Sequence, residues 1–83
     1  MNDERQDLEV QILELERRRA ELKMLYASSL ANVEKLRRAG SRADVERALA
    51  LAESRRIELA KCDATLTAMG QALDVLKRAN DDA

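Results

Sequence analysis

The sequence contains no proline, histidine, tryptophan or phenylalanine, and it has only two glycines, one cysteine and one tyrosine. A β-sandwich or barrel needs turn formers together with β-branched and aromatic residues, and valine and isoleucine number only six here. One cysteine cannot form a disulfide within the chain, and without histidine an ordinary zinc site lacks its ligands. These absences exclude β architectures, disulfide frameworks and structural zinc domains.

The net charge and the lengths of the apolar runs indicate where in the cell the protein is located. The net charge is −1, so no overall field draws the chain to nucleic acid or a membrane. Residues 1–7 are acidic and lack the apolar core of a secretory signal. The longest apolar run, residues 48–52, is far too short to span a bilayer. Because a lone cysteine, Cys62, fits a reducing compartment, we expect a cytoplasmic protein with no membrane segment.

What the sequence does contain is helix-forming. Hydrophobic residues make up 46% and charged residues 37% of the 83 positions, the composition of long helices. Basic residues precede Gly40, so we expect Gly40 to end a helix in the left-handed conformation. Ser41 and Asp44 have the spacing of a capping box for a second helix, and Gly70 is expected inside that helix at some cost. Residues 1–83 are thus predicted to form one hairpin, with helices over 3–39 and 42–79 and a turn at 40–41.

Two series of seam residues, spaced alternately by four and three, predict a coiled-coil-like contact between the helices. The series mirror each other about the turn, since paired residue numbers such as those of Leu22 and Leu59 add to 81. The predicted fold class is therefore all-α, an antiparallel two-helix hairpin. The seam residues are Leu8, Ile12, Leu15, Arg19, Leu22, Tyr26, Ser29, Val33 and Leu36, then Val45, Ala48, Ala52, Arg55, Leu59, Cys62, Leu66, Met69, Leu73 and Leu76.

Three seam residues are not typical core residues. Arg55 is expected to stack on Tyr26 opposite it, and Arg19 is expected to lie opposite Cys62 within reach of Glu16. Cys62 itself is expected to be a small buried residue. Other charges are expected to pair along each helix, namely Glu14 with Arg18, Glu34 with Arg38, Glu53 with Arg56, and Asp74 with Arg78.

Apolar residues outside the seam predict association, because two helices alone enclose no core. Met24 is level with Ile57 and Leu13 is level with Ala68, which indicates a second apolar strip along one side. We expect this strip to close a four-helix bundle in a homodimer, or to bind a partner protein's amphipathic helix. The candidate partner-binding residues are Leu13, Met24, Leu30, Leu51, Ile57 and Ala64.

The two ends of the hairpin differ in charge. Residues 1–16 hold six acidic residues and one basic one, whereas residues 30–50 hold five basic and three acidic ones. An antiparallel dimer would place each acidic open end beside a basic turn end, so that orientation is expected. Nucleic-acid binding is not expected, because no aromatic platform accompanies the basic residues.

The sequence predicts no catalytic residue, cofactor or metal, because it lacks histidine and any glycine-rich phosphate loop. In shape, the expected hairpin resembles the Rop-type bundle proteins and the small helical co-chaperones of type III secretion needle subunits. No motif of either family matches residue by residue, so no residue role is carried over. We expect a non-enzymatic protein-interaction module, such as an adaptor, chaperone partner or inhibitor. The alternatives are a needle co-chaperone-like hairpin and a nucleic-acid-associated or purely structural coiled coil.

Overall fold

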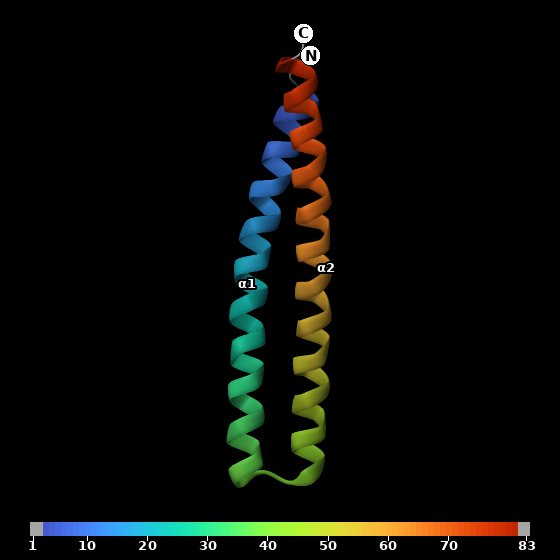
Figure 1. Ribbon diagram of the computed structural model, residues 1–83. Coiled ribbons are helices and arrows are strands. Elements are labelled where there is room, and N and C mark those ends of the chain that lie inside the picture. The colour runs from blue at the N-terminus through green and yellow to red at the C-terminus, as the bar shows by residue number, and fades with distance from the viewer. Residues whose placement is uncertain (1–2, 82–83) are drawn as a thin grey trace.

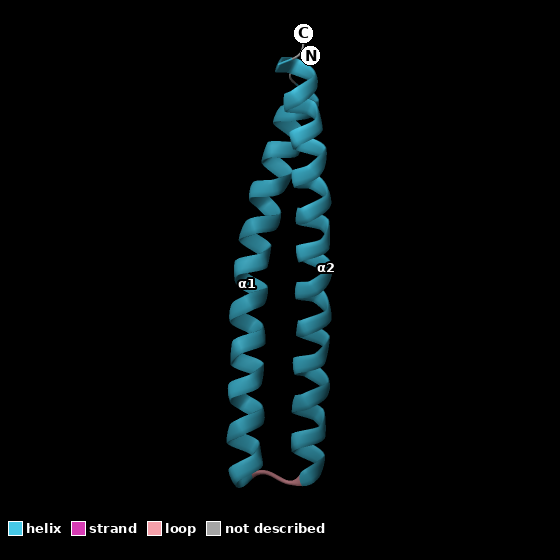
Figure 2. Ribbon diagram, in the orientation of Figure 1, coloured by secondary structure: helices cyan, strands magenta, loops and turns pink. Residues whose placement is uncertain are grey.

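The computed structural model describes residues 3–81, which form two long helices running in opposite directions (Figure 1). Helix α1 spans Asp3–Ala39 and helix α2 spans Arg42–Asp81, two residues beyond the expected end at 79. Within residues 3–81, only Gly40 and Ser41 lie outside the helices (Figure 2). The predicted all-α antiparallel hairpin is confirmed. The two residues at each end of the predicted hairpin, 1–2 and 82–83, lie outside the described part.

The turn begins where α1 ends at Ala39, and Gly40 does not adopt the expected left-handed conformation. Its φ is not positive, and its backbone N–H donates a hydrogen bond to the Leu36 carbonyl at 2.6 Å. A Cβ atom at residue 40 would lie 2.9 Å from that oxygen and 3.0 Å from Leu36 Cδ2. Glycine is therefore needed because the chain passes so close to the last helical turn, and the predicted reason was wrong.

The expected capping box at the start of α2 is confirmed. The Asp44 N–H donates to Ser41 Oγ at 3.2 Å, and the Ser41 N–H donates to Asp44 Oδ2 at 3.4 Å. Aspartate replaces the more usual glutamate of this motif. Each side chain satisfies a backbone donor at the helix start, where no carbonyl is available within the helix.

The predicted seam is confirmed, because every residue of both series is buried or half-buried. Burial is deepest between the middle of the arms and the turn, where Leu22 is 2% and Val33 3% exposed. The Ser29 hydroxyl donates to the Leu25 carbonyl at 2.8 Å, so its polar group is satisfied inside the seam. Cys62 is buried as expected, and its thiol lies 3.5 Å from the Leu15 carbonyl oxygen as a hydrogen-bond donor.

The seam is less well covered toward the open end of the rod, which measures 63 × 15 × 13 Å. There the larger seam residues are only half-buried, and among residues 3–81 no buried residue lies nearer the open end than Leu22 on α1 and Cys62 on α2. The open half of the hairpin therefore presents apolar seam residues to its surroundings. These residues are Leu8, Ile12, Leu15, Leu66, Met69, Leu73 and Leu76.

Candidate interaction surfaces

A groove runs along one flank of the open half of the hairpin. It consists of two adjoining hollows of about 630 and 350 Å³ that share Ile12. Ile12, Leu66 and Leu73 supply apolar lining, and Gly70 adds depth because a Cβ there would meet nothing within 4 Å. We call this the open-end groove. It combines an apolar lining with charged rims.

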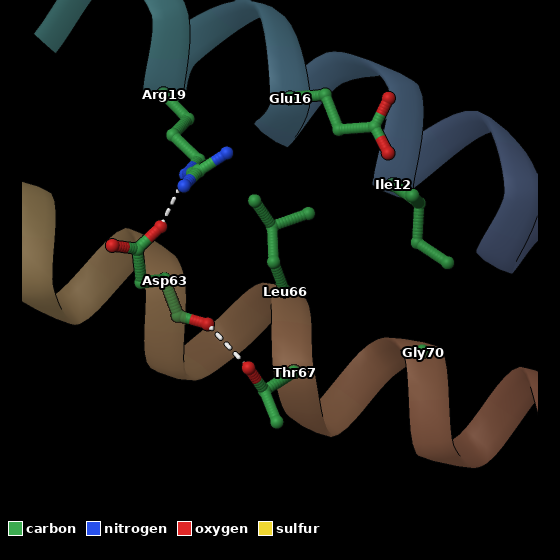
Figure 3. A pocket seen from close by; sticks show the side chains of 7 residues that line it. All are labelled: Ile12, Glu16, Arg19, Asp63, Leu66, Thr67 and Gly70. Carbon is green, nitrogen blue, oxygen red and sulfur yellow. Dashed lines mark hydrogen bonds and ion pairs between the residues drawn. The ribbon is translucent and has the colours of Figure 1, made fainter. Parts of the chain in front are cut away.

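Arg19 and Asp63 form an ion pair at the inner end of this groove (Figure 3). Arg19 extends from α1 to α2 and does not pair with Glu16, whose carboxylate points away from it in Figure 3. Glu16, which the sequence places within reach of Arg19, is therefore not its partner. Glu16 lies on the same helix, whereas Asp63 faces Arg19 across the seam. The Asp63 carbonyl also accepts a hydrogen bond from Thr67 Oγ1 at 3.0 Å.

The same flank continues toward the turn, because residues that are seven positions apart lie on the same side of a coiled coil. Leu30 lies 14 residues after Glu16, and Leu49 lies 21 residues before Gly70. Both leucines are exposed, at 44% and 42%. We call this side the groove flank; it comprises Glu9, Glu16, Lys23, Leu30 and Arg37 of α1 and Leu49, Arg56, Asp63, Gly70 and Lys77 of α2.

The opposite flank carries Leu51, together with Leu25. An ion pair between Arg18 and Glu58, at 3.5 Å, joins the helices on this side. A shallow hollow of about 530 Å³ lies beside Leu51 near the turn and is lined partly by Asn32. We call this side the Leu51 flank. Leu51 and Leu30 were grouped as partner-binding candidates, but the structure places them on different sides of the hairpin.

The predicted strip through Met24 and Ile57 does not lie on one side of the molecule. Met24 stands two residues after Leu22 and two before Tyr26, so it points about 160–180° away from the seam. Ile57 has the same position relative to its own seam neighbours, and so it faces outward from α2. The two residues are level but on opposite outer faces, because being level across the seam does not mean facing one another.

The other predicted pair behaves similarly, since Leu13 lines the open-end groove whereas Ala68 lies toward the Leu51 flank. All six candidate residues are exposed. Leu13 lines the open-end groove and Leu30 belongs to the groove flank, whereas Ile57 and Ala64 share the outer face of α2. Sequence reasoning did not select Asp63, Gly70 or Leu49 for the groove flank, although their seven-residue spacing was a usable signal.

Charged residues on the exposed faces are largely paired. Arg56 binds Glu53 with two hydrogen bonds of 2.9 and 2.5 Å, which confirms that expected pair. The hydrogen bond from Arg56 lowers the pKa of Glu53, and the same bond raises the pKa of Arg56. Three arginines of the basic turn end also have acidic partners, namely Arg37 with Glu34, Arg42 with Glu46, and Arg47 with Asp44.

Other expected pairs differ in the structure. Arg18 pairs with Glu21 and Glu58 and not with Glu14. Glu34 pairs with Arg37, one residue before the expected Arg38. Within residues 3–81, Asp74 and Arg78 form no ion pair. These exposed side chains have several partners at similar reach, so helical spacing alone does not select one.

No group of three or more potential metal ligands gathers within residues 3–81. Neither α1 nor α2, as far as it is described, is apolar enough over a sufficient length to cross a membrane. Comparison of the chain with models of known protein families, with curated protein sequences and with solved structures finds no match.

Proposed function

We propose that this protein is a non-enzymatic protein-interaction module of the cytoplasm that binds a partner's amphipathic helix. The observation that carries the proposal is its uncovered apolar surface. Nine large apolar side chains among the described residues are between 38% and 72% exposed. Such residues mark an interaction surface where several of them lie together on one face. The nine are Val10, Leu13, Met24, Leu25, Leu30, Leu49, Leu51, Ile57 and Val75.

The outer face of α1 is the best-formed site for a partner helix. From Ala20 to Ala31, apolar residues recur on it at steps of four, three and four residues, the spacing that a packed helix requires. Met24, the most exposed of the large apolar residues at 72%, stands at its centre. Alanines on either side keep this face low, so that a second helix can approach closely. The face comprises Val10, Ala20, Met24, Ala27 and Ala31.

The test is capture of partners from a native host extract by the wild-type protein, a Met24→Glu variant and a Glu21→Gln control. We expect the wild type and the control to capture proteins that Met24→Glu does not capture. These proteins should remain bound at about 1 M salt, which screens surface charges beyond about 3 Å. Partners that bind all three proteins equally, or that leave when salt is raised or nuclease is added, would contradict the proposal and favour a charge-based interaction.

A further inference from the structure

We propose that a second copy of this chain occupies the open-end groove, in an antiparallel arrangement with the turns at opposite ends. The inference rests on the proposed function insofar as both depend on uncovered apolar surface, but it concerns the neighbouring groove flank and does not involve Met24. The groove flank has a hollow at one end and an apolar projection, Leu30 with Leu49, near the other. A face with both features can pair with a copy of itself.

The residue numbers along α2 locate the symmetry axis. Leu49 and Gly70 add to 119, and so do Arg56 and Asp63, all four on the groove flank. A twofold axis at the midpoint, between Leu59 and Ala60, therefore places Leu49 of the second copy over Gly70. The same axis places Arg56 of the second copy beside Asp63. One operation thus places a large apolar side chain over a bare backbone, and it brings the Arg56–Glu53 ion pair of one copy beside the Arg19–Asp63 ion pair of the other.

Helix α1 independently gives the same axis. Leu13 of the groove and Leu30 near the turn are the two exposed leucines on this side of α1, and their midpoint lies next to Leu22. The seam already sets Leu22 level with Leu59, because their numbers add to 81. Both midpoints consequently lie at one level of the rod. A single twofold axis through this level stacks α1 on α1 and α2 on α2.

Orientation follows from shape and charge. In a parallel dimer, the two grooves would face each other and the two projections of Leu30 and Leu49 would face each other. The grooves would then remain empty. The antiparallel dimer also places the acidic first turns of α1, with Asp3 and Glu4, near the basic turn end of the other copy, with Arg37 and Arg38. The face is 63 Å long and 15 Å wide, comparable with the roughly 800 Å² per partner of a stable interface.

Cysteine cross-linking tests which face is used. In a Cys62→Ala background, Ala60→Cys lies beside the axis and Ala64→Cys lies one turn away on the outer face of α2; both alanines are exposed. Under mild oxidation, residue 60 should form a disulfide between copies and residue 64 should not. Cross-linking through residue 64 in place of residue 60 would overturn the assignment of the face.

Spin labels test the orientation. Labels at Arg42→Cys in the same background lie at the turn end, where the side chain is exposed. With the axis at the level of Leu22, the two labels should be about 50 Å apart at 1.5 Å of rise per residue. A separation under about 20 Å is much shorter than one helical arm and would place both turns at the same end of the dimer. That result would overturn the antiparallel arrangement.

Gly70→Gln separates association from folding. The new side chain extends into open space in the single hairpin and replaces a poor helix former, so the hairpin should still fold. It occupies the position of Leu49 of the second copy, and the dimer should therefore weaken by about ten- to a hundredfold. Ala64→Gln, on the outer face, should leave the dissociation constant unchanged.

Sedimentation equilibrium over micromolar to millimolar concentrations measures these constants. An unchanged constant for Gly70→Gln would overturn the placement of Leu49 over Gly70. A wild-type protein that remains monomeric throughout would overturn the whole inference. That outcome would leave the proposed function standing, because partner capture is tested through Met24, which points away from the seam, and with a different variant.

Discussion

Arg19 of α1 and Asp63 of α2 form an ion pair across the seam at a level where the heptad pattern calls for an apolar residue on α1. The arginine interrupts the apolar series without being left unpaired. Both side chains remain nearly half-exposed, so the pair gains little from burial. Its structural consequence is register: sliding one helix along the other by one turn would separate Arg19 from this partner.

The first prediction concerns the strength of this pair. A double-mutant cycle with Arg19→Gln and Asp63→Asn should give a coupling free energy of about 0.2–1 kcal/mol, because exposed ion pairs contribute little. The coupling should decrease as salt is raised. The measurement is urea unfolding of the four proteins followed by circular dichroism. A coupling energy well above this range at high salt would mean that the pair is desolvated, contrary to its exposure.

The second prediction concerns the middle of the seam. Leu22 is 2% exposed, so Leu22→Ala should lower the free energy of unfolding by about 2–5 kcal/mol through lost burial and the cavity left behind. Met24→Ala, two residues away on the outer face, should change it by less than about 0.5 kcal/mol. Urea unfolding at one low protein concentration compares them. Equal midpoints for both variants would show that the seam does not run through Leu22.

The third prediction gives opposite signs for the two glycines. Gly40→Ala should lower stability by about 1–3 kcal/mol, because the new Cβ would meet the Leu36 carbonyl oxygen at 2.9 Å. Gly70→Ala should raise it by up to about 1 kcal/mol, because alanine favours the helix and its Cβ meets no neighbour. Thermal and urea unfolding below the concentration of any self-association give both values. The same sign for both would contradict the geometry of the turn.

The fourth prediction concerns pH. The pKa of Glu53 is lowered chiefly by the hydrogen bond from Arg56, with the charge of Arg56 a smaller cause. Because the folded-state pKa is below the unfolded one, the pair stabilises the fold above the ordinary glutamate range. This stabilisation is lost as the pH falls through the lowered value. A carboxyl-carbon NMR titration of Glu53 measures the shift directly.

Two variants of Arg56 separate the causes of that shift. Arg56→Gln removes the charge and the two-pronged hydrogen bond, so the pKa of Glu53 should rise to its ordinary range. Arg56→Lys retains the charge but not the paired guanidinium hydrogen bonds. It should raise the pKa of Glu53 most of the way to its ordinary value, because the hydrogen bond is the larger cause of the shift. A Glu53 pKa in Arg56→Lys equal to that of the wild type would show that charge alone is responsible.

The helices, the seam and the capping box could be predicted because each depends on residues close in sequence or on a regular repeat. Leu22 and Leu59 could be paired from the constant sum about the turn, and Ser41 and Asp44 from their spacing. The outward direction of Met24 and Ile57 was also readable, since each stands midway between two seam residues. The predicted strip was wrong because residues that are level along the rod do not necessarily face each other.

By itself, the sequence determined an antiparallel hairpin with a known register, because heptad spacing and local capping act within one helix or between two mirrored ones. Only the tertiary structure decided that Arg19 pairs with Asp63 and not with Glu16, since Glu16 is near in sequence whereas Asp63 comes within reach only across the seam. It also decided that Gly40 is needed for its closeness to Leu36. The open-end groove likewise depends on the position of Gly70 beside residues of α1, because a hollow forms only where two surfaces come together in space.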